Sequence, residues 1–225
     1  MARQMGDPGP DPRKRGMSDI QTLARGGASI KEFAAYYFER LAEVLGSLDL
    51  DELAELEREL ESARIEGRTV FIAGNGGSAT TATSMANDLG FDVLKKTATD
   101  RTFRIHALTD NVAALTAIAN DVGYERVFVD QMRIHFRPGD VLIVVSASGN
   151  SSNVVLAAEW AKTQGSTIIA FLGFSGGRLM ELADIKIHFK TEQGEYGPVE
   201  DAHLIVNHIL AHWFQNKIGS KDLGS

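Results

Sequence analysis

Two loops of the chain combine glycine with hydroxyl or amide side chains, and each precedes a helical pattern. They are Gly74-Asn75-Gly76-Gly77-Ser78 and Ser146-Ala147-Ser148-Gly149-Asn150-Ser151-Ser152-Asn153. Glycines let the backbone approach a ligand closely. The free N–H groups and the dipole of a helix N-terminus, together with serine hydroxyls, suit a phosphate dianion. The loops therefore predict a site for a phosphorylated small molecule, with two plain helix-capping turns as the simplest alternative.

A nucleotide cofactor is a second interpretation of the first loop, because Gly74, Gly76 and Ala79 match the dinucleotide fingerprint. That fingerprint needs an acidic residue about 20 residues further on, where it binds the ribose. Asp110 lies well beyond this spacing. A Walker A loop needs Gly-Lys-Ser or Gly-Lys-Thr, which the chain lacks. We therefore expect no NAD and no flavin.

The elements that would position these loops alternate between strands and helices. Buried parallel strands are expected at Thr69–Ala73, Phe103–Leu108, Val141–Val145, Thr167–Leu172 and Ile185–Phe189. Helices are expected at Ser78–Leu94, Val112–Ala119, Glu125–Phe136, Asn153–Gln164, Gly177–Leu182 and about Pro198–Gln215. Alternation of this kind predicts an α/β fold, a doubly wound parallel sheet with ligands at the carboxyl ends of the strands.

The chain before the first strand shows two helical stripes of apolar residues. One begins at Ile30, and the other includes Leu53, Leu56 and Leu60. We expect residues 1–17 to be a disordered tail and 18–66 to form helices that share the main domain and contribute to a subunit interface. The main domain is expected at 67–217 and a C-terminal tail at 218–225.

The composition limits the classes of partner. The chain has 225 residues, a formal net charge of −7 and no cysteine. The negative charge argues against nucleic acid or an anionic membrane as the main partner. The lack of cysteine removes disulfides and thiolate catalysis and fits a reducing compartment. No apolar run reaches the roughly 20 residues that span a bilayer. We expect a cytoplasmic protein.

Residues 70 to about 214 resemble the sugar isomerase (SIS) domain family, and within it the phosphoheptose isomerases. Four segments carry the resemblance: the AGNGGSA loop, the LTDN turn, AIAND at 117–121 and GDVLIVVSASGNSSNV. It implies a five-stranded parallel sheet flanked by helices, assembled as a homotetramer with active sites between subunits. It also implies isomerisation of sedoheptulose 7-phosphate to glycero-manno-heptose 7-phosphate through an enediol. The alternatives are a non-catalytic phosphosugar-binding or regulatory protein, or an isomerase of another sugar phosphate.

The resemblance also implies roles for residues of the loops. The sugar would be contacted by Asn75, Gly76 and Gly77, and the site would be lined by Thr109 and Asp110. The phosphate would be held by Ser146, Ala147, Ser148 and Ser151. Ser78 and Asn150 complete the expected substrate-binding set.

Three side chains form the expected catalytic set. The family's catalytic Glu corresponds to Asp88 and its catalytic His to His208, and a family Gln corresponds to Glu200. Ketose–aldose isomerisation needs a base at the carbon and an acid near the oxygens, and carboxylates with a histidine suit both tasks. Glu200 and His208 share one helix face because they are eight residues apart. His203 could support His208 or lie at an interface.

The place of Asp88 in its helix adds a constraint. It lies ten residues after Ser78, about 15 Å along the helix axis. Asp88 therefore points away from its own glycine loop. Its use in catalysis requires a site assembled across a subunit boundary.

A metal ion is the remaining open question. Metal-binding members of the family carry a His one turn before the catalytic Glu, where this chain has Ser84. Zinc takes three or four ligands, and Asp88, Glu200 and His208 could supply three. Equally, two neighbouring carboxylates could raise the pKa of one of them and make a metal-free base. No cofactor is certain, and zinc stays possible.

Overall fold

The computed structural model describes residues 26–219. The expected tail at residues 1–17 and most of the expected tail at 218–225 lie outside the described residues. The chain divides into two compact units, of which the first ends at Arg40 and the second begins at Leu41.

Helix α2 (Ile30–Gly46) begins in the first unit. Ser29 and Glu32 form a reciprocal capping box at its start. The Glu32 side chain accepts from the Ser29 backbone N–H at 2.8 Å, and the Ser29 hydroxyl accepts from the Glu32 N–H at 3.3 Å. Because both donors would otherwise lack a partner, this arrangement fixes where the helix starts.

The second unit contains a sheet of five parallel strands in the order β2-β1-β3-β4-β5. The strands are β1 (Thr69–Gly74), β2 (Arg104–Ala107), β3 (Val141–Ser146), β4 (Thr167–Leu172) and β5 (Ile185–His188). The predicted α/β fold and its five strands are confirmed. The bounds of β4 are the expected ones, those of β1, β3 and β5 differ by one residue at one end, and β2 is one residue shorter than expected at each end.

The helices of the second unit follow the expected order with altered bounds. They are α3 (Leu50–Glu66), α4 (Gly77–Met85), α5 (Val93–Thr97), α6 (Val112–Asp121), α7 (Val129–His135), α8 (Ser152–Thr163), α9 (Leu179–Leu182) and α10 (Tyr196–Gly219). A 3-10 turn, η3 (Tyr124–Arg126), takes the start of the helix expected at 125–136. The last helix is longer at both ends than the expected 198–215.

The helix expected at 78–94 is not a uniform α-helix. A π-helical segment, η2 (Ala86–Asp92), lies between α4 and α5. The Val93 N–H donates to the carbonyl of Asp88, five residues earlier. Such segments are rare in proteins, and those that occur are often found at functional sites. This one contains Asp88.

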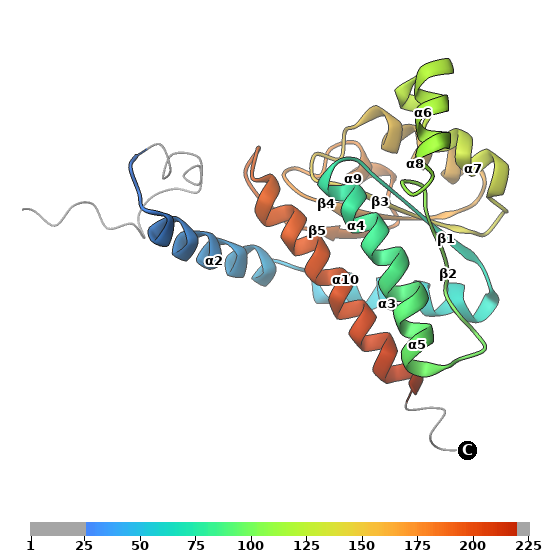
Figure 1. Ribbon diagram of the computed structural model, residues 1–225, viewed down its shortest axis with the longest axis horizontal. Helices are drawn as coiled ribbons and strands as arrows, with labels where there is room; N and C mark the ends of the chain where they lie inside the picture. The colour runs from blue at the N-terminus through green and yellow to red at the C-terminus, as the bar shows by residue number, and fades with distance from the viewer. Residues whose placement is uncertain (1–25, 220–225) are drawn as a thin grey trace, which may run out of the picture. The chain divides into compact units, whose positions relative to one another are not determined.

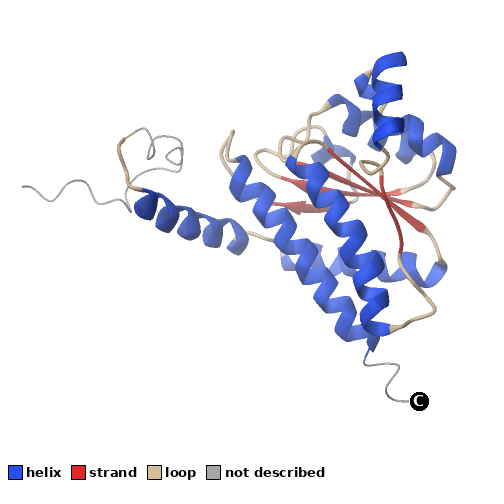
Figure 2. Ribbon diagram, viewed as in Figure 1, coloured by secondary structure: helices blue, strands red, loops and turns tan. Residues whose placement is uncertain are grey.

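Helices cover both faces of the sheet (Figures 1 and 2). Along each strand, successive side chains point to opposite faces. Val70 and Ile72 pack in one apolar cluster with residues of α3, α4, α5 and α10. Phe71 and Ala73 pack in the other with residues of α7, α8 and α9. Double coverage explains why the three central strands, β1, β3 and β4, are almost wholly apolar and buried.

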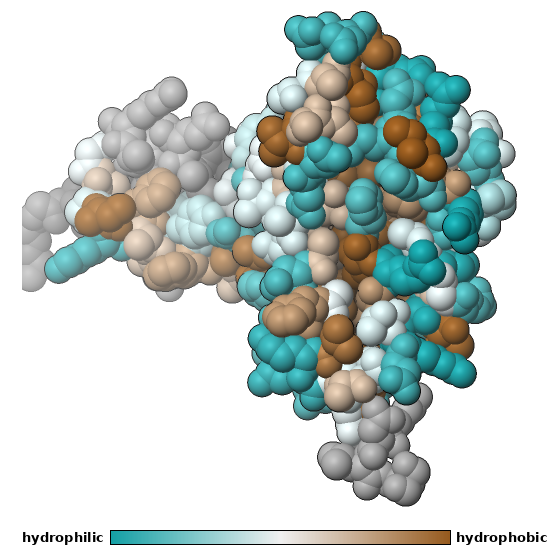
Figure 3. All heavy atoms as spheres, turned by 45° about the vertical axis from the view of Figure 1, so that its right-hand side comes forward, coloured by the Kyte–Doolittle hydropathy of each residue, from teal (hydrophilic) through white to brown (hydrophobic). Residues whose placement is uncertain are grey.

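The exposed surface carries scattered apolar residues. On the face shown in Figure 3, hydrophobic residues lie among hydrophilic ones rather than in one continuous patch. Among residues 26–219, no helix combines the length and apolarity needed to cross a bilayer.

Candidate functional site

The glycine loop connects β1 to α4 and depends on its glycines at specific positions. Gly76 has φ +57° and ψ −124°, a conformation that side-chain-bearing residues rarely adopt. A Cβ on Gly74 would lie 2.6 Å from the carbonyl oxygen of Ser78. Ser78 lies inside α4 and is buried, and the residue at the helix cap is Gly76. Ser78 therefore does not cap α4, because the tight turn places it two residues beyond the cap position.

The serine loop connects β3 to α8 and is held by hydrogen bonds within itself. The Ser146 hydroxyl accepts from the Gly149 N–H at 3.1 Å, and the Ser148 hydroxyl accepts from the Asn150 N–H at 3.4 Å. Ser151 is the N-cap residue of α8, and its side chain makes no capping hydrogen bond with that described helix. Its hydroxyl and the first N–H groups of α8 therefore remain suitable donors for an anion.

The serine loop also rests against the glycine turn that follows β4. The Asn150 side chain accepts from the Arg178 N–H at 2.9 Å and donates to the Ser148 carbonyl at 3.1 Å. A Cβ on Gly149 would collide with the carbonyl oxygen of Gly176. Asn150 thus braces the loop, while its expected contact with a substrate stays a prediction.

The glycine and serine loops are joined by a reciprocal amide pair. Asn75 donates to Asn153 at 2.9 Å, and Asn153 donates back to Asn75 at 2.9 Å. Asn153 is buried, and the Tyr124 hydroxyl donates to the Asn75 oxygen at 2.9 Å. The loops meet because β1 and β3 are neighbours in the sheet. The sequence interpretation did not assign this role to Asn153 and missed Tyr124, which no motif marks.

The LTDN turn at 108–111 follows β2 and is hydrogen-bonded to α4. The Thr83 hydroxyl donates to Asp110 at 2.8 Å and lies 3.2 Å from the Thr109 hydroxyl. Asn111 caps α6 by accepting from the Ala114 N–H. Thr109 and Asp110 therefore lie beside the helix that the glycine loop starts, as the sequence predicts for one shared edge of the sheet.

Glu200 lies near the start of α10, next to the glycine loop. A Cβ added to Gly77 would overlap the Glu200 carboxyl group, so the carboxyl occupies the space that a larger residue would fill. Burial, and secondarily the charge of Asp201, raises the pKa of Glu200 above its ordinary value. The sequence predicts that a neighbouring carboxylate would raise the pKa of one member of the catalytic set. For Glu200 the main cause is instead desolvation.

Asp88 and His208 form the second group of expected catalytic residues. The His208 Nε2 lies 3.7 Å from Asp88 Oδ2. Asp88 Oδ1 accepts from Asn87 at 2.9 Å, and Oδ2 accepts from Asn207 at 2.6 Å. The carboxylate is mostly buried, whereas 55% of the His208 side chain is exposed.

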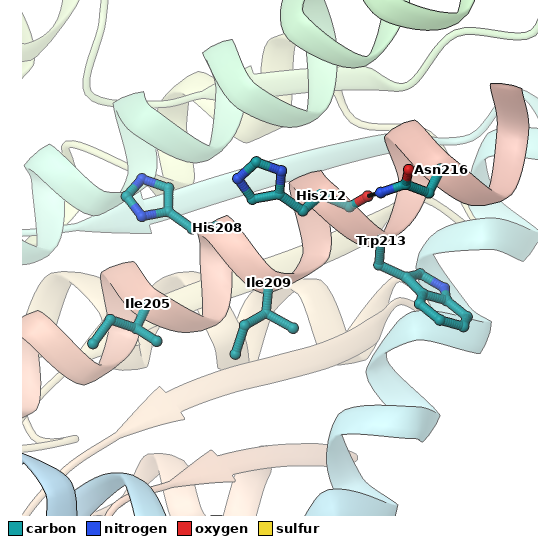
Figure 4. Close-up of a pocket in the computed structure, with 6 residues that line it drawn as sticks. All are labelled: Ile205, His208, Ile209, His212, Trp213 and Asn216. Atoms are coloured by element: carbon teal, nitrogen blue, oxygen red, sulfur yellow. Dashed lines mark hydrogen bonds between the residues drawn. The ribbon is translucent and has the colours of Figure 1, made fainter.

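The exposed face of α10 around His208 borders an open hollow. Figure 4 shows His208 and His212 on one side of the helix, and Ile205 and Ile209 on the other. Trp213 and Asn216 complete the lining. An exposed imidazole beside an apolar surface can meet a group brought by another molecule.

His203 is a core residue rather than a site residue. It is fully buried, and its Nε2 donates to the Leu172 carbonyl at 3.2 Å. Burial lowers the pKa of His203 to about 4, so the ring is neutral near pH 7. This excludes the expected interfacial location.

The expected catalytic set does not gather at one point within a chain. Glu200 and His208 are eight residues apart on α10, about 12 Å along the helix axis. Glu200 accompanies the glycine loop, while Asp88 and His208 lie further along the two helices. No three histidine or carboxylate side chains among residues 26–219 group as metal ligands. Asp88, Glu200 and His208 of one chain therefore do not fit a zinc centre, which needs three or more.

Comparison with known proteins reveals clear relatives. Residues 33–173 match the model of the SIS domain. The chain is 39% identical over 149 residues to the phosphoheptose isomerase of Rhodospirillum rubrum, covering 66% of this chain and 76% of that protein. It is 32% identical over 184 residues to a probable phosphoheptose isomerase of Thermoplasma acidophilum, covering 82% and 98%.

A solved structure supports the same relationship. The phosphoheptose isomerase of Neisseria gonorrhoeae superposes with a TM-score of 0.73 at 25% identity, covering 84% of this chain and all of that one.

The packing of the serine loop generates a stability prediction with a matched control. Gly149 and Gly165 both have positive φ, but only Gly149 faces a neighbouring backbone. We expect Gly165→Ala to cost about 1 kcal/mol of unfolding free energy. We expect Gly149→Ala to cost about 3 kcal/mol or more, because overlap adds to strain. Urea unfolding measures both, and equal costs would contradict the packing of the loop on the turn.

The raised pKa of Glu200 generates a pH prediction. The folded protein binds this proton more tightly than the unfolded chain, so the group's contribution to stability is complete below about pH 4.5 and is lost as the pH rises through the folded pKa. We therefore expect Glu200→Gln to raise the urea midpoint at pH 7 relative to the wild-type protein, and to change it little at pH 4.

The control for this experiment is Glu55→Gln, at an exposed position of α3. We expect it to change the midpoint little at either pH. A Glu200→Gln protein that is no more stable than wild type at pH 7 would show that burial does not disfavour this carboxylate.

Proposed function

The chain belongs to the SIS domain family, and we propose that it is an aldose–ketose isomerase that interconverts sedoheptulose 7-phosphate and glycero-manno-heptose 7-phosphate. The similarity to phosphoheptose isomerases over most of both chains carries the proposal. The joined glycine and serine loops support it, because they provide an anion site beside a polar surface.

The serine loop is the proposed phosphate site. Ser146, Ser148 and Ser151 supply hydroxyls, and α8 supplies N–H groups at its N-terminus. A phosphate dianion at such a terminus gains from several hydrogen bonds and from the helix dipole. Ala147 contributes backbone, since its side chain has no polar atom.

The glycine loop and the loop after β2 are proposed to bind the sugar. The Asn75 amide is fixed by Asn153 and Tyr124, so it offers its remaining capacity in a defined direction. Thr109 and Asp110 provide further hydroxyl and carboxylate groups for the sugar hydroxyls. These groups orient a polyhydroxy chain whose far end is held by its phosphate.

The proton transfer is proposed to use Asp88, His208 and Glu200. From the ketose, a base removes a proton from C1, and an acid protonates the oxygen on C2, giving the enediol. Return of a proton to C2 and loss of the O1 proton then give the aldose, with no net change in protons. The Asp88 and His208 side chains lie 3.7 Å apart, so either could reach the carbon-bound proton after a small motion. Glu200 is proposed to transfer protons to and from the oxygens on C1 and C2.

We place the complete site between two copies of the chain. The loops and Glu200 lie at one end of α4 and α10, and the Asp88–His208 pair lies about 12 Å away. A second copy that supplies its own pair would complete the set, and the exposed imidazole of His208 supports this arrangement. A homotetramer in the cytoplasm fits the family resemblance. Zinc binding stays a prediction. A zinc site would need ligands from two subunits, so no step of the reaction is assigned to zinc.

The central experiment is turnover of sedoheptulose 7-phosphate, followed by NMR for appearance of the aldose. We expect wild type to equilibrate the two sugars. His208→Ala and Asp88→Ala should lose about 10²- to 10⁴-fold in kcat, the usual contribution of a positioned acid or base. The reaction is run with and without added zinc. No turnover in either condition would overturn the proposal and favour a binding or regulatory role, or another sugar phosphate.

Complementation tests the shared site. Ser148→Asp places a carboxylate in the phosphate loop, and His208→Ala removes the imidazole. Each variant alone should be nearly inactive. If a site takes its loops from one chain and His208 from another, random mixing by co-expression restores about a quarter of the sites. Activity no higher than that of the separate variants would place the whole site within one chain.

A further inference from the structure

Asn207 is a fully buried amide on α10, one residue before His208. Its Nδ2 donates to Asp88 Oδ2 at 2.6 Å. Its Oδ1 is buried and has no hydrogen-bond partner among the described residues. The amide nitrogen therefore makes a short hydrogen bond to a candidate catalytic carboxylate, whereas the amide oxygen accepts no hydrogen bond from the described residues.

The unpaired oxygen shows that stability alone does not favour an amide here. A buried acceptor without a donor costs free energy that an apolar side chain of the same size avoids. The neighbours of Asn207 along α10, Val206 and Leu210, pack in the apolar cluster. A leucine at position 207 would suit these surroundings. The amide is therefore better explained by the hydrogen bond that it donates to Asp88.

The bond from Asn207 fixes the carboxylate that faces His208. The same atom, Asp88 Oδ2, accepts from Asn207 and lies 3.7 Å from His208 Nε2. Within residues 26–219, the other oxygen accepts a hydrogen bond only from Asn87, whose side chain is on the exposed side of the helix. Asp88 also lies in the π-helical segment, where the backbone is not held in a regular α-helix. The buried amide is thus the firmest support that the carboxylate has.

We propose that Asn207 is a positioning residue, which holds Asp88 in the orientation needed for proton transfer with His208. This inference rests on the proposed isomerase activity. Asn207 acts through Asp88, because its buried amide cannot reach a substrate. An amide is also a neutral donor, so it orients the carboxylate without adding a fixed positive charge beside the imidazole.

Asn207→Leu removes the bond and the unpaired oxygen together. We expect kcat to fall about 10- to 100-fold, since misplacing a reacting group by about 1 Å can cost about 10²-fold. KM should stay within about threefold, because the loops that bind the substrate are untouched. The urea midpoint should be equal to or higher than that of wild type. Loss of kcat without loss of stability is the result that a purely structural role would not give.

Two further variants sharpen the test. Asn87→Ala removes the exposed amide on the other oxygen, where water can replace it, so we expect a smaller loss. In the Asp88→Ala background, Asn207→Leu should cause no further loss, because both act through one group. Equal losses from Asn87→Ala and Asn207→Leu, or an additive double variant, would overturn the assignment. Asn207→Ala serves in the same comparisons if the leucine variant does not fold.

A crystal structure of Asn207→Leu separates this inference from the proposed function. We expect the Asp88 carboxylate to leave the position that it occupies in the wild-type protein. If wild type isomerises the sugar and the variant keeps its kcat, Asn207 is not a positioning residue and the proposed function stands. If wild type has no activity, the proposed function falls. An unmoved Asp88 carboxylate in the variant would overturn the inference by itself.

Discussion

The packing of α10 along α4 and the π-helical segment determines where every candidate catalytic side chain lies. Both helices begin at the edge of the sheet where the ligand loops lie, and they run side by side in the same direction (Figure 1). Glu200 therefore meets Gly77 near the start, and Asn207 and His208 meet Asp88 further along. Apolar residues of both helices, such as Met85 and Val206, lie in one buried cluster that fixes this alignment. A shift of one turn would break all of these contacts together.

The alignment places ligand-binding groups at one end of the two helices and possible proton-transfer groups further along them. The end at the carboxyl edge of the sheet collects N–H groups, hydroxyls and amides, which suit a charged and hydroxylated ligand. The other end has the Asp88 carboxylate and the His208 imidazole, which are the types of group that can transfer protons. Because about 12 Å of helix separates Glu200 from the Asp88–His208 pair, the proposed site combines the two groups from different copies of the chain. Assembly of copies is thus a requirement of the proposed chemistry as well as a matter of stability.

Much of the fold and of the loops could be predicted from the sequence, because both depend on local signals. Strands such as 141–146 are short apolar runs, and the glycine loop needs backbone conformations that only its own residues can adopt. The missed features join distant parts of the chain. Asn207 lies 119 residues from Asp88, and Tyr124 lies 49 residues from Asn75. Nothing in the local pattern around Asn207 distinguishes a buried donor from a polar residue on a helix surface. The π-helical segment was missed because it reflects tertiary packing rather than helix propensity.

The π-helical segment also has a consequence for how this region tolerates insertions and deletions. One residue of an α-helix turns the following side chains by about 100°, and a π turn accommodates one residue more than an α turn. The buried faces of α4 and α5 are therefore kept in phase with the sheet only because the extra residue is absorbed between them. Removing one residue between 86 and 92 would therefore make the helix regular and leave α5 in its present phase, whereas inserting a further residue would turn α5 by about 100° away from its present neighbours. The segment should thus tolerate a deletion better than an insertion.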